Sequence, residues 1–414
     1  MVAPQPFYED RGTPIAVRRL LEALSELAYN VDVLTYPVGR DLDLPGVRVL
    51  RTANPFGLRR VPIGLSLAKL TLDVPLAWAL AARLRTRQYA CVHALEEAAF
   101  PAVVLGRRYG VPVIYDMQSS LPEQLRRYPL LGSPLAQRVL TGAERWLLRN
   151  AGWVVSFAGL APRVRTVTPD ARAHEWRYPG LGHPDSPAAA AELRLRLGVP
   201  AGAPVVLYSG TFEPHQGLSL LLRAAALIRV QRPDVRFVLV GGNGEDAEVV
   251  RRQVAELGLP DVVRLIERQP RELMPSYLAM ASVAVSTRTG GGNLPLKIFD
   301  YLAAGRPIVA TDIAAHRAVL TAERAVLVTP EPRAMAEAIT ALLADRRRAA
   351  RLADRARAYA ASTLGWPAFV TSVRELYEEV IARPWAGNGE PSPRADAGGQ
   401  RREEAIDACI QRRQ

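Results

Sequence analysis

The chain has 414 residues, of which 49% are apolar and 23% are charged. This composition excludes a disordered or collagen-like chain, and the length predicts two or three domains that each bury a core. Two cysteines, Cys91 and Cys409, exclude a disulfide scaffold and a four-cysteine zinc site. No apolar run reaches ~18 residues, and charges at Glu9, Asp10 and Arg11 interrupt the start. We therefore expect a soluble, cytoplasmic protein without a membrane span or a signal peptide.

The net charge is +12, and 51 of the 53 basic residues are arginines. Arginine suits bidentate recognition of phosphate, but such a skew in an alanine-rich chain is also typical of a biased genome composition. The basic residues are spread along the chain without interleaved aromatic residues, so no nucleic-acid partner is expected. The positive net charge also favours binding to an anionic membrane surface, which stays open as a possible partner.

Short apolar runs alternate with longer amphipathic stretches along most of the chain. The first half predicts strands at residues 31–35, 47–50, 90–93, 111–116 and 154–156, with helices such as 15–27 and 135–149 between them. The second half predicts strands at 205–209, 235–240, 262–266, 283–286, 308–311 and 325–328. Continuous Val, Leu and Ile runs are typical of parallel strands buried on both faces. The alternation predicts an α/β fold made of two doubly wound, Rossmann-like domains.

The beginning of the chain leaves little room for a first strand. Residues 1–3 are followed at once by Pro4, although Gly12 and the residues after it are typical of a strand-loop-helix unit. The first strand of a wound sheet is normally central. Two explanations stay open: the natural start lies upstream, which we favour, or the sheet has lost a strand.

The boundary between the domains is expected in a proline- and glycine-rich stretch between residues 178 and 204. We expect a first domain at 1–183, a second at 184–365 and a separate helix at 366–383. Residues 384–414 are poor in apolar side chains and predict a disordered tail.

Ligands of open α/β sheets bind beyond the carboxyl ends of the strands. In the second half, three glycines at 290–292 precede a predicted helix that Pro295 would open. Exposed backbone N–H groups and the helix dipole there predict a cradle for a diphosphate. Lys297, in the first turn, would neutralise the diphosphate, and Asp300 would accept hydrogen bonds from ribose hydroxyls. The alternatives are a solvated lysine and an ordinary first-turn carboxylate.

Two further loops carry weaker signals. Residues 242–247 match the dinucleotide pattern Gly-x-Gly-x-x-Ala, but no suitable acidic residue follows at the required distance, so a nicotinamide cofactor is not favoured. In the first half, Asp116 ends a strand and is expected to point into a cleft, with His93 at the tip of a neighbouring strand. A purely structural histidine is the alternative. The other histidines lack metal-ligand spacing, so no metal is expected.

These segments resemble family 4 glycosyltransferases with the GT-B architecture, from residue 4 to about 382. The most specific stretch is LPLKIFDYLAAGRPIVATD at 294–312, and residues 208–224, 271–286, 4–17 and 92–102 are similar to further segments. The resemblance implies transfer of a hexose from a nucleoside diphosphate sugar, as UDP or GDP sugar, to an acceptor hydroxyl with retained configuration. The acceptor would be a glycan, a polysaccharide or a lipid-linked precursor. It also implies a C-terminal helix that crosses back onto the first domain and no cofactor besides the nucleotide sugar.

The resemblance implies roles for particular residues. Catalysis would fall to Asp116, His93 and Lys297, the first two on the acceptor side. The donor would be held by Gly12, Gly210, Thr211, Gln216, Arg268, Arg288, Gly292, Asn293, Leu294, Pro295, Leu296 and Asp300. The family commonly has an arginine and a lysine where this chain has Thr211 and Gln216, and a glutamate where it has Gly292. These departures leave open a non-catalytic protein of the same fold that binds nucleotide sugars.

Basic clusters in the first half suggest where a membrane would bind. They lie at residues 59–60, 83–87, 107–108 and 126–127, beside the apolar stretch 65–82. This combination predicts peripheral attachment of the acceptor domain to the inner face of an anionic membrane. An ordinary solvated helix surface is the alternative.

Overall fold

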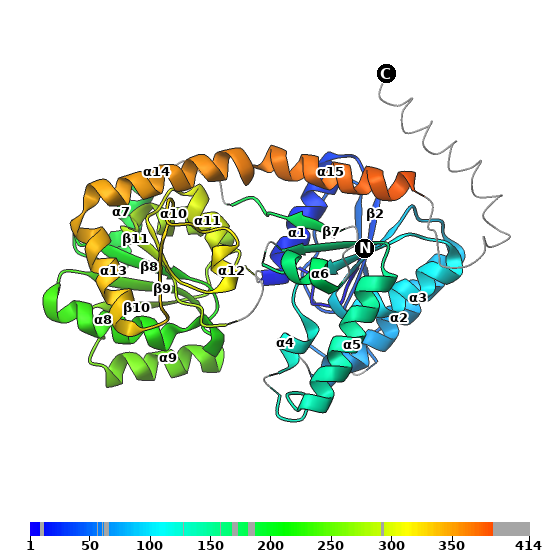
Figure 1. The fold of residues 1–414 in the computed structure, drawn as a ribbon, viewed down its shortest axis with the longest axis horizontal. Helices are drawn as coiled ribbons and strands as arrows, with labels where there is room; N and C mark the ends of the chain where they lie inside the picture. Colours follow the sequence, from blue (N-terminus) through cyan, green and yellow to red (C-terminus); the bar gives the residue numbers. More distant parts are fainter. Residues whose placement is uncertain are drawn as a thin grey trace, which may run out of the picture.

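The computed structural model describes residues 1–8, 12–55, 57–59, 61, 66–126, 128–157, 159–167, 173–180, 187–290 and 294–383. These residues form two parallel β-sheets, each packed between helices (Figure 1). This arrangement confirms the predicted two-domain α/β fold. The expected domain boundary at 183–184 and the expected tail at 384–414 lie outside the described residues.

The first sheet has the strand order β3-β2-β1-β4-β5-β6-β7. Its strands are β1 (Val2–Ala3), β2 (Val31–Thr35), β3 (Val47–Arg51), β4 (Val92–Leu95), β5 (Val113–Met117), β6 (Trp153–Phe157) and β7 (Ala173–Trp176). Its helices are α1 (Gly12–Glu26), α2 (Leu67–Thr86), α3 (Ala99–Tyr109), α4 (Leu121–Leu125), α5 (Pro134–Asn150) and α6 (Ala161–Val167). The predicted strands are present, with ends shifted by no more than two residues.

Two strands of this sheet correct the sequence analysis. The sheet has not lost its first strand: β1 lies at the centre, and Val2 pairs in parallel register with both Leu34 of β2 and Ala94 of β4. The edge strand β7 was not predicted, since three of its four residues are only half-buried and no apolar run marks it.

The second sheet has the order β10-β9-β8-β11-β12-β13. Its strands are β8 (Val205–Ser209), β9 (Arg236–Gly242), β10 (Val263–Glu267), β11 (Val283–Ser286), β12 (Ile308–Thr311) and β13 (Val326–Val328). Its helices are α7 (Pro187–Arg196), α8 (Leu218–Gln231), α9 (Gly244–Glu256), α10 (Met274–Met280), α11 (Lys297–Ala303), α12 (Ala314–Arg317), α13 (Pro332–Ala344) and α14 (Arg346–Thr363). Because β8 and β11 are neighbours, the loops that follow them meet at one edge of the sheet.

The last helix, α15 (Trp366–Ala382), returns from the second sheet to the first and packs on α1 and β7 (Figure 1). Its two ends are anchored by indole hydrogen bonds. Trp366 Nε1 donates to Glu26 at 2.6 Å, and Trp153 Nε1 donates to Glu379 at 3.2 Å. In the described ranges, no helix combines the length and apolar character needed to cross a membrane.

Candidate active site

Lys297 is buried at the start of α11. Only 8% of the residue is exposed, which excludes the solvated lysine. Its Nζ donates a hydrogen bond to Oε1 of Gln216 at 3.2 Å and lies 3.8 Å from the ring centroid of Tyr208. The helix begins at Lys297 itself, so the expectation that Pro295 opens it is wrong. An amide oxygen and an aromatic face, two uncharged groups, thus surround the ammonium.

The loop after β8 leaves room for this ammonium at Gly210. The φ angle of Gly210 is +135°, and a Cβ there would lie 2.9 Å from Lys297 Nζ. The Thr211 hydroxyl donates to Glu213 Oε2 at 2.8 Å, so that side chain is used within its own loop. The Tyr208 hydroxyl donates to the carbonyl oxygen of Thr211 at 2.7 Å and fixes the loop over the strand.

Arg288 is a second buried cation, in the loop after β11. It is 7% exposed, and its Nε donates to the carbonyl oxygen of Gly290 at 2.6 Å. Burial lowers the pKa of Arg288 below its usual value. Burial, and then the positive charge of Arg288, hold the pKa of Lys297 well below the usual lysine value. The surroundings of Lys297 therefore disfavour its charged form.

Other expected donor residues lie around this pair. Asp300 forms an ion pair with Arg271 at 3.3 Å, and both side chains are largely buried. Arg268 follows β10, and its backbone N–H donates to the carbonyl oxygen of Gly242 at 3.2 Å, so it belongs to a loop further along the sheet. Among the expected donor residues that the structure describes, four lie close together: Gly210, Gln216, Arg288 and Lys297.

The remaining expected donor residues have different positions. Leu294 is a buried core residue, and Leu296 lines a small hollow where α1 of the first half meets the second half. Gly12 begins α1, on the first-half side of that contact. Gly292 and Asn293 lie outside the described residues.

In the first half, His93 and Asp116 meet as expected from the neighbouring strands β4 and β5. His93 Nε2 lies 3.3 Å from Asp116 Oδ2, and Gln118 Nε2 donates to Asp116 Oδ1 at 2.6 Å. Asp116 is only 1% exposed, so it does not point openly into a cleft as predicted. The Tyr377 hydroxyl of α15 lies 2.9 Å from His93 Nδ1, and Trp176 stacks on the same imidazole. Asp116 and Tyr377 therefore hold both ring nitrogens of His93.

Glu96, directly after β4, was not predicted as a site residue. Its φ angle is +45°, a backbone conformation that is strained for any residue other than glycine. Such conformations cluster at functional sites. The Ser119 hydroxyl donates to Glu96 Oε1 at 2.9 Å. Burial and the neighbouring Glu97 carboxylate raise the pKa of Glu96 to about 7. The acidic pair after a strand was its only sequence signal.

A buried histidine under the donor loops was also missed. His316 Nδ1 donates to the carbonyl oxygen of Thr311 at 2.7 Å, and the Ser286 hydroxyl donates to Nε2 at 2.9 Å. Burial lowers the pKa of His316 to about 4, which keeps the ring neutral. It ties the end of β11 to that of β12 and thereby supports the loop that carries Arg288.

Comparison with known proteins places this geometry in a family. Residues 190–359 match the family described as glycosyl transferases group 1, and residues 11–159 match the glycosyl transferase 4-like domain. The chain is 30% identical over 296 residues to the D-inositol 3-phosphate glycosyltransferase of Thermomonospora curvata, covering 66% of this chain and 67% of the relative. The chain belongs to the GT-B glycosyltransferases of the family 4-like kind.

Other relatives extend this likeness over most of the chain. The D-inositol 3-phosphate glycosyltransferase of Thermobispora bispora is 27% identical over 406 residues, 90% of each protein. The sucrose-phosphate synthase of Thermosynechococcus elongatus has a TM-score of 0.74 at 25% identity and covers 90% of this chain and 94% of its own. HepE of Anabaena, in complex with UDP-glucose, has a TM-score of 0.72 at 18% identity, over 91% of this chain and 98% of its own, and shows the fold alone. This chain is therefore a glycosyltransferase, and the family resemblance is confirmed.

Proposed function

We propose that this glycosyltransferase moves a hexose from a nucleoside diphosphate sugar to an acceptor hydroxyl, with retained configuration. One observation carries the proposal: two buried basic side chains lie at the carboxyl edge of the second sheet, where open α/β sheets bind ligands. Arg288 follows β11, and Lys297 reaches from α11 to Gly210 after β8. The complex of HepE with UDP-glucose and the relatives named D-inositol 3-phosphate glycosyltransferase agree with it.

The physical reason is the cost of charging Lys297. Burial, and then the positive charge of Arg288, hold the pKa of Lys297 well below its usual value, so an anion placed beside its Nζ stabilises the ammonium. A diphosphate leaving group would be such an anion, and its charge develops during transfer. Because the cations and the loop are already in place, they stabilise the leaving group by electrostatic preorganisation. No metal is expected to take part, and this stays a prediction.

We assign the other residues by position. Asp300 would contact the nucleoside side of the donor, and Gln216 would lie beside the diphosphate with Lys297. Asp116 and His93 would line the acceptor side. Each oxygen of Asp116 already accepts one hydrogen bond and has a second lone pair, to which an acceptor hydroxyl would donate. The acceptor would be a glycan, a polysaccharide or a lipid-linked precursor.

The substitution Lys297→Ala tests the donor site. We expect it to weaken UDP binding by about 1.5–3 kcal/mol, the range for a hydrogen bond to a charged group, or roughly 10- to 150-fold. Calorimetric titration of UDP measures the change. Arg223→Ala is the matched control, because Arg223 is an exposed cation of α8 in the same half. Equal UDP affinity in wild type and Lys297→Ala contradicts the proposal.

A second candidate function is binding of the nucleotide sugar without turnover. It is motivated by Thr211 and Gln216, which replace the basic pair common in the family, and by the use of Thr211 within its own loop. Radiolabelled UDP-glucose and GDP-mannose, incubated with the protein with and without acceptors, separate the two functions. Transfer or slow hydrolysis supports the enzyme, whereas tight binding without turnover across the acceptor panel supports the binder.

The family resemblance and the surface of α2 support attachment to an anionic membrane. Three apolar residues spaced by four, Leu70, Val74 and Trp78, are 51%, 71% and 77% exposed on one face of this helix. Arg85 continues the same face and is also exposed. An apolar stripe with flanking arginines is typical of helices that lie in a membrane interface. We propose that α2 places the acceptor half there.

A further inference from the structure

Arg271 and Asp300 form an ion pair between two segments that lie apart in the sequence. Arg271 begins the short helix η3 (Arg271–Leu273) after β10, and Asp300 lies in the first turn of α11. Arg271 Nη2 donates a hydrogen bond to Asp300 Oδ1 at 3.3 Å, and the two side chains are only 15% and 16% exposed. The pair therefore ties the carboxyl end of an edge strand to the helix that carries Lys297.

Stability alone is a weak reason for such a pair. Removing two charges from water costs about as much free energy as their attraction returns, and apolar side chains would often serve equally well. The guanidinium of Arg271 is also incompletely satisfied, because its buried Nε has no hydrogen-bond partner among the described residues. Buried polar groups that are kept at such a cost point to a role beyond stability.

Asp300 lies beside Lys297 on α11. The two residues are three positions apart, so their side chains leave the same side of the helix, with Cβ atoms about 5–6 Å apart. Lys297 extends to Gly210, where we place the diphosphate of the donor. In a nucleoside diphosphate sugar the ribose is bonded directly to that diphosphate. A ribose therefore falls within reach of Asp300, one helix turn from the lysine.

A carboxylate suits a ribose because it can accept hydrogen bonds from both neighbouring hydroxyls, at the 2′ and 3′ positions. Asp300 has a single methylene group, so one fixed contact is enough to orient its carboxylate. Arg271 supplies such a contact at Oδ1. Since each carboxylate oxygen has two lone pairs, the ribose hydroxyls can bind without breaking the ion pair.

We infer that Arg271 is a positioning residue that fixes Asp300 for the 2′- and 3′-hydroxyls of the donor ribose. The inference rests on the proposed function and goes one step beyond it: through this pair the donor site distinguishes ribonucleotides from deoxyribonucleotides. A 2′-deoxyribose leaves the Asp300 carboxylate without one of its hydrogen bonds, and such a loss is what lets a site reject an analogue. A carboxylate that Arg271 does not hold loses part of this discrimination.

The test measures the binding of UDP and 2′-deoxy-UDP to the full chain by calorimetric titration. We expect wild type to bind UDP about tenfold or more tightly, the effect of one hydrogen bond to a charged group. In Arg271→Gln this preference falls below about threefold, because the carboxylate is no longer oriented, whereas the affinity for 2′-deoxy-UDP changes little. Arg271→Lys keeps a positive charge and restores part of the preference. Should Arg271→Gln not fold, Arg271→Met replaces it, since its unbranched side chain leaves no new polar atom buried.

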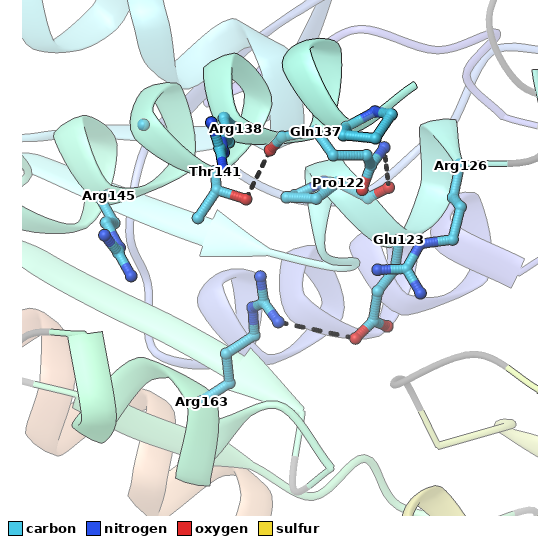
Figure 2. Close-up of a pocket in the computed structure, with 10 residues that line it drawn as sticks. Pro122, Glu123, Arg126, Gln137, Arg138, Thr141, Arg145 and Arg163 are labelled. Carbon is cyan, nitrogen blue, oxygen red and sulfur yellow. Dashed lines mark hydrogen bonds and ion pairs between the residues drawn. The ribbon is translucent and has the colours of Figure 1, made fainter. Parts of the chain in front are cut away.

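The control breaks an ion pair elsewhere in the chain. Arg163 of α6 lines a hollow of about 530 Å³ between α4, α5 and α6 (Figure 2). It pairs with the buried Glu144 at 2.8 Å and with Glu123 at 3.7 Å. Arg163→Gln therefore removes the cation of a partly buried pair in the first half, and it should keep the wild-type preference for UDP. The Tm of each variant shows how far each pair stabilises the fold.

An unchanged preference for UDP in Arg271→Gln overturns the inference, and so does equal affinity of wild type for the two nucleotides. A loss of affinity that is the same for UDP and 2′-deoxy-UDP also overturns it, because this assigns the pair to stability alone. A preference that falls in Arg271→Gln and returns in Arg271→Lys supports it. If wild type binds neither nucleotide, the proposed function itself fails, and the ground of the inference fails with it.

Discussion

At the scale of single residues, the buried position of Lys297 disfavours its charged form. Its side chain is buried beside Arg288, and both effects hold its pKa well below the usual value. In the protein without ligand, Lys297 therefore loses its proton at a lower pH than an ordinary lysine. A bound diphosphate favours the ammonium instead, so it must raise the pKa of Lys297.

Binding of UDP should therefore take up a proton. Above the second pKa of a phosphate monoester, which is about 6, we expect Lys297 to take up part of a proton, most of all between its free and bound pKa values, and the affinity to fall as the pH rises through that window. The sign follows because the bound state holds more protons than the free state in the window between the two lysine pKa values. Calorimetry in two buffers of different ionisation enthalpy measures the uptake. Lys297→Met should bind without uptake, and a wild-type signal independent of the buffer contradicts this account.

The sequence predicted part of this site and could not predict the rest. Lys297 and the pairing of His93 with Asp116 follow from residue type and strand ends, which local patterns reveal. Tyr377 contacts His93 from 284 residues further along the chain, and no local pattern encodes that contact. The strained backbone of Glu96 is equally invisible, because its φ angle depends on the surrounding fold.

At the scale of elements, apolar runs identified the strands that are covered on both faces. β8 is a run of this kind, with four of its five residues buried. β1 and β7 were not predicted, for different reasons. β1 is only two residues long, and β7 is a half-buried edge strand without an apolar run. In helix α2, apolar residues do not predict burial, because they face both the core and the solvent. Composition alone does not separate the two faces.

The exposed face of α2 predicts membrane binding. With Val74→Gln and Trp78→Gln, we expect binding to anionic vesicles to weaken at least tenfold, because burial of each large apolar side chain contributes about 1.5–3 kcal/mol. Co-sedimentation measures the binding, and a shift of tryptophan emission should follow it in wild type. Binding should also weaken as salt rises, since the arginines near the helix contribute about 1 kcal/mol each.

A matched pair tests whether any exposed apolar residue would act in the same way. Leu195 and Val230 are 82% and 84% exposed on helices of the second half. The variant with Leu195→Gln and Val230→Gln should bind vesicles like wild type. An equal loss of vesicle binding in both variants, or no binding by wild type at low salt, would contradict the proposal that α2 binds the membrane.

At the scale of the whole molecule, the two halves share one apolar core. Its buried residues include Leu24 of α1, Trp176 of β7, Leu207 of β8, Phe299 of α11 and Leu376 of α15. Gly180, in the segment that follows β7, lies against α11. Because α11 begins with Lys297, we expect this contact to influence where the proposed donor site lies relative to the first half.

Gly180→Ala tests that role of the linker. The new Cβ would lie 2.3 Å from the carbonyl oxygen of Phe299 and 2.6 Å from the Cβ of Ala303, so the linker or α11 must move. Overpacking of this kind costs about 1–3 kcal/mol, and each kcal/mol lowers the Tm of a domain of this size by about 2–4 °C. Gly142→Ala is the control, because nothing lies within 4 Å of a Cβ there and alanine favours its helix by about 0.5–1 kcal/mol. Calorimetry should show a lower Tm and weaker UDP binding for Gly180→Ala alone, since a displaced α11 carries Lys297 with it. A lower Tm with unchanged UDP affinity would mean that the linker stabilises the core without positioning the donor site.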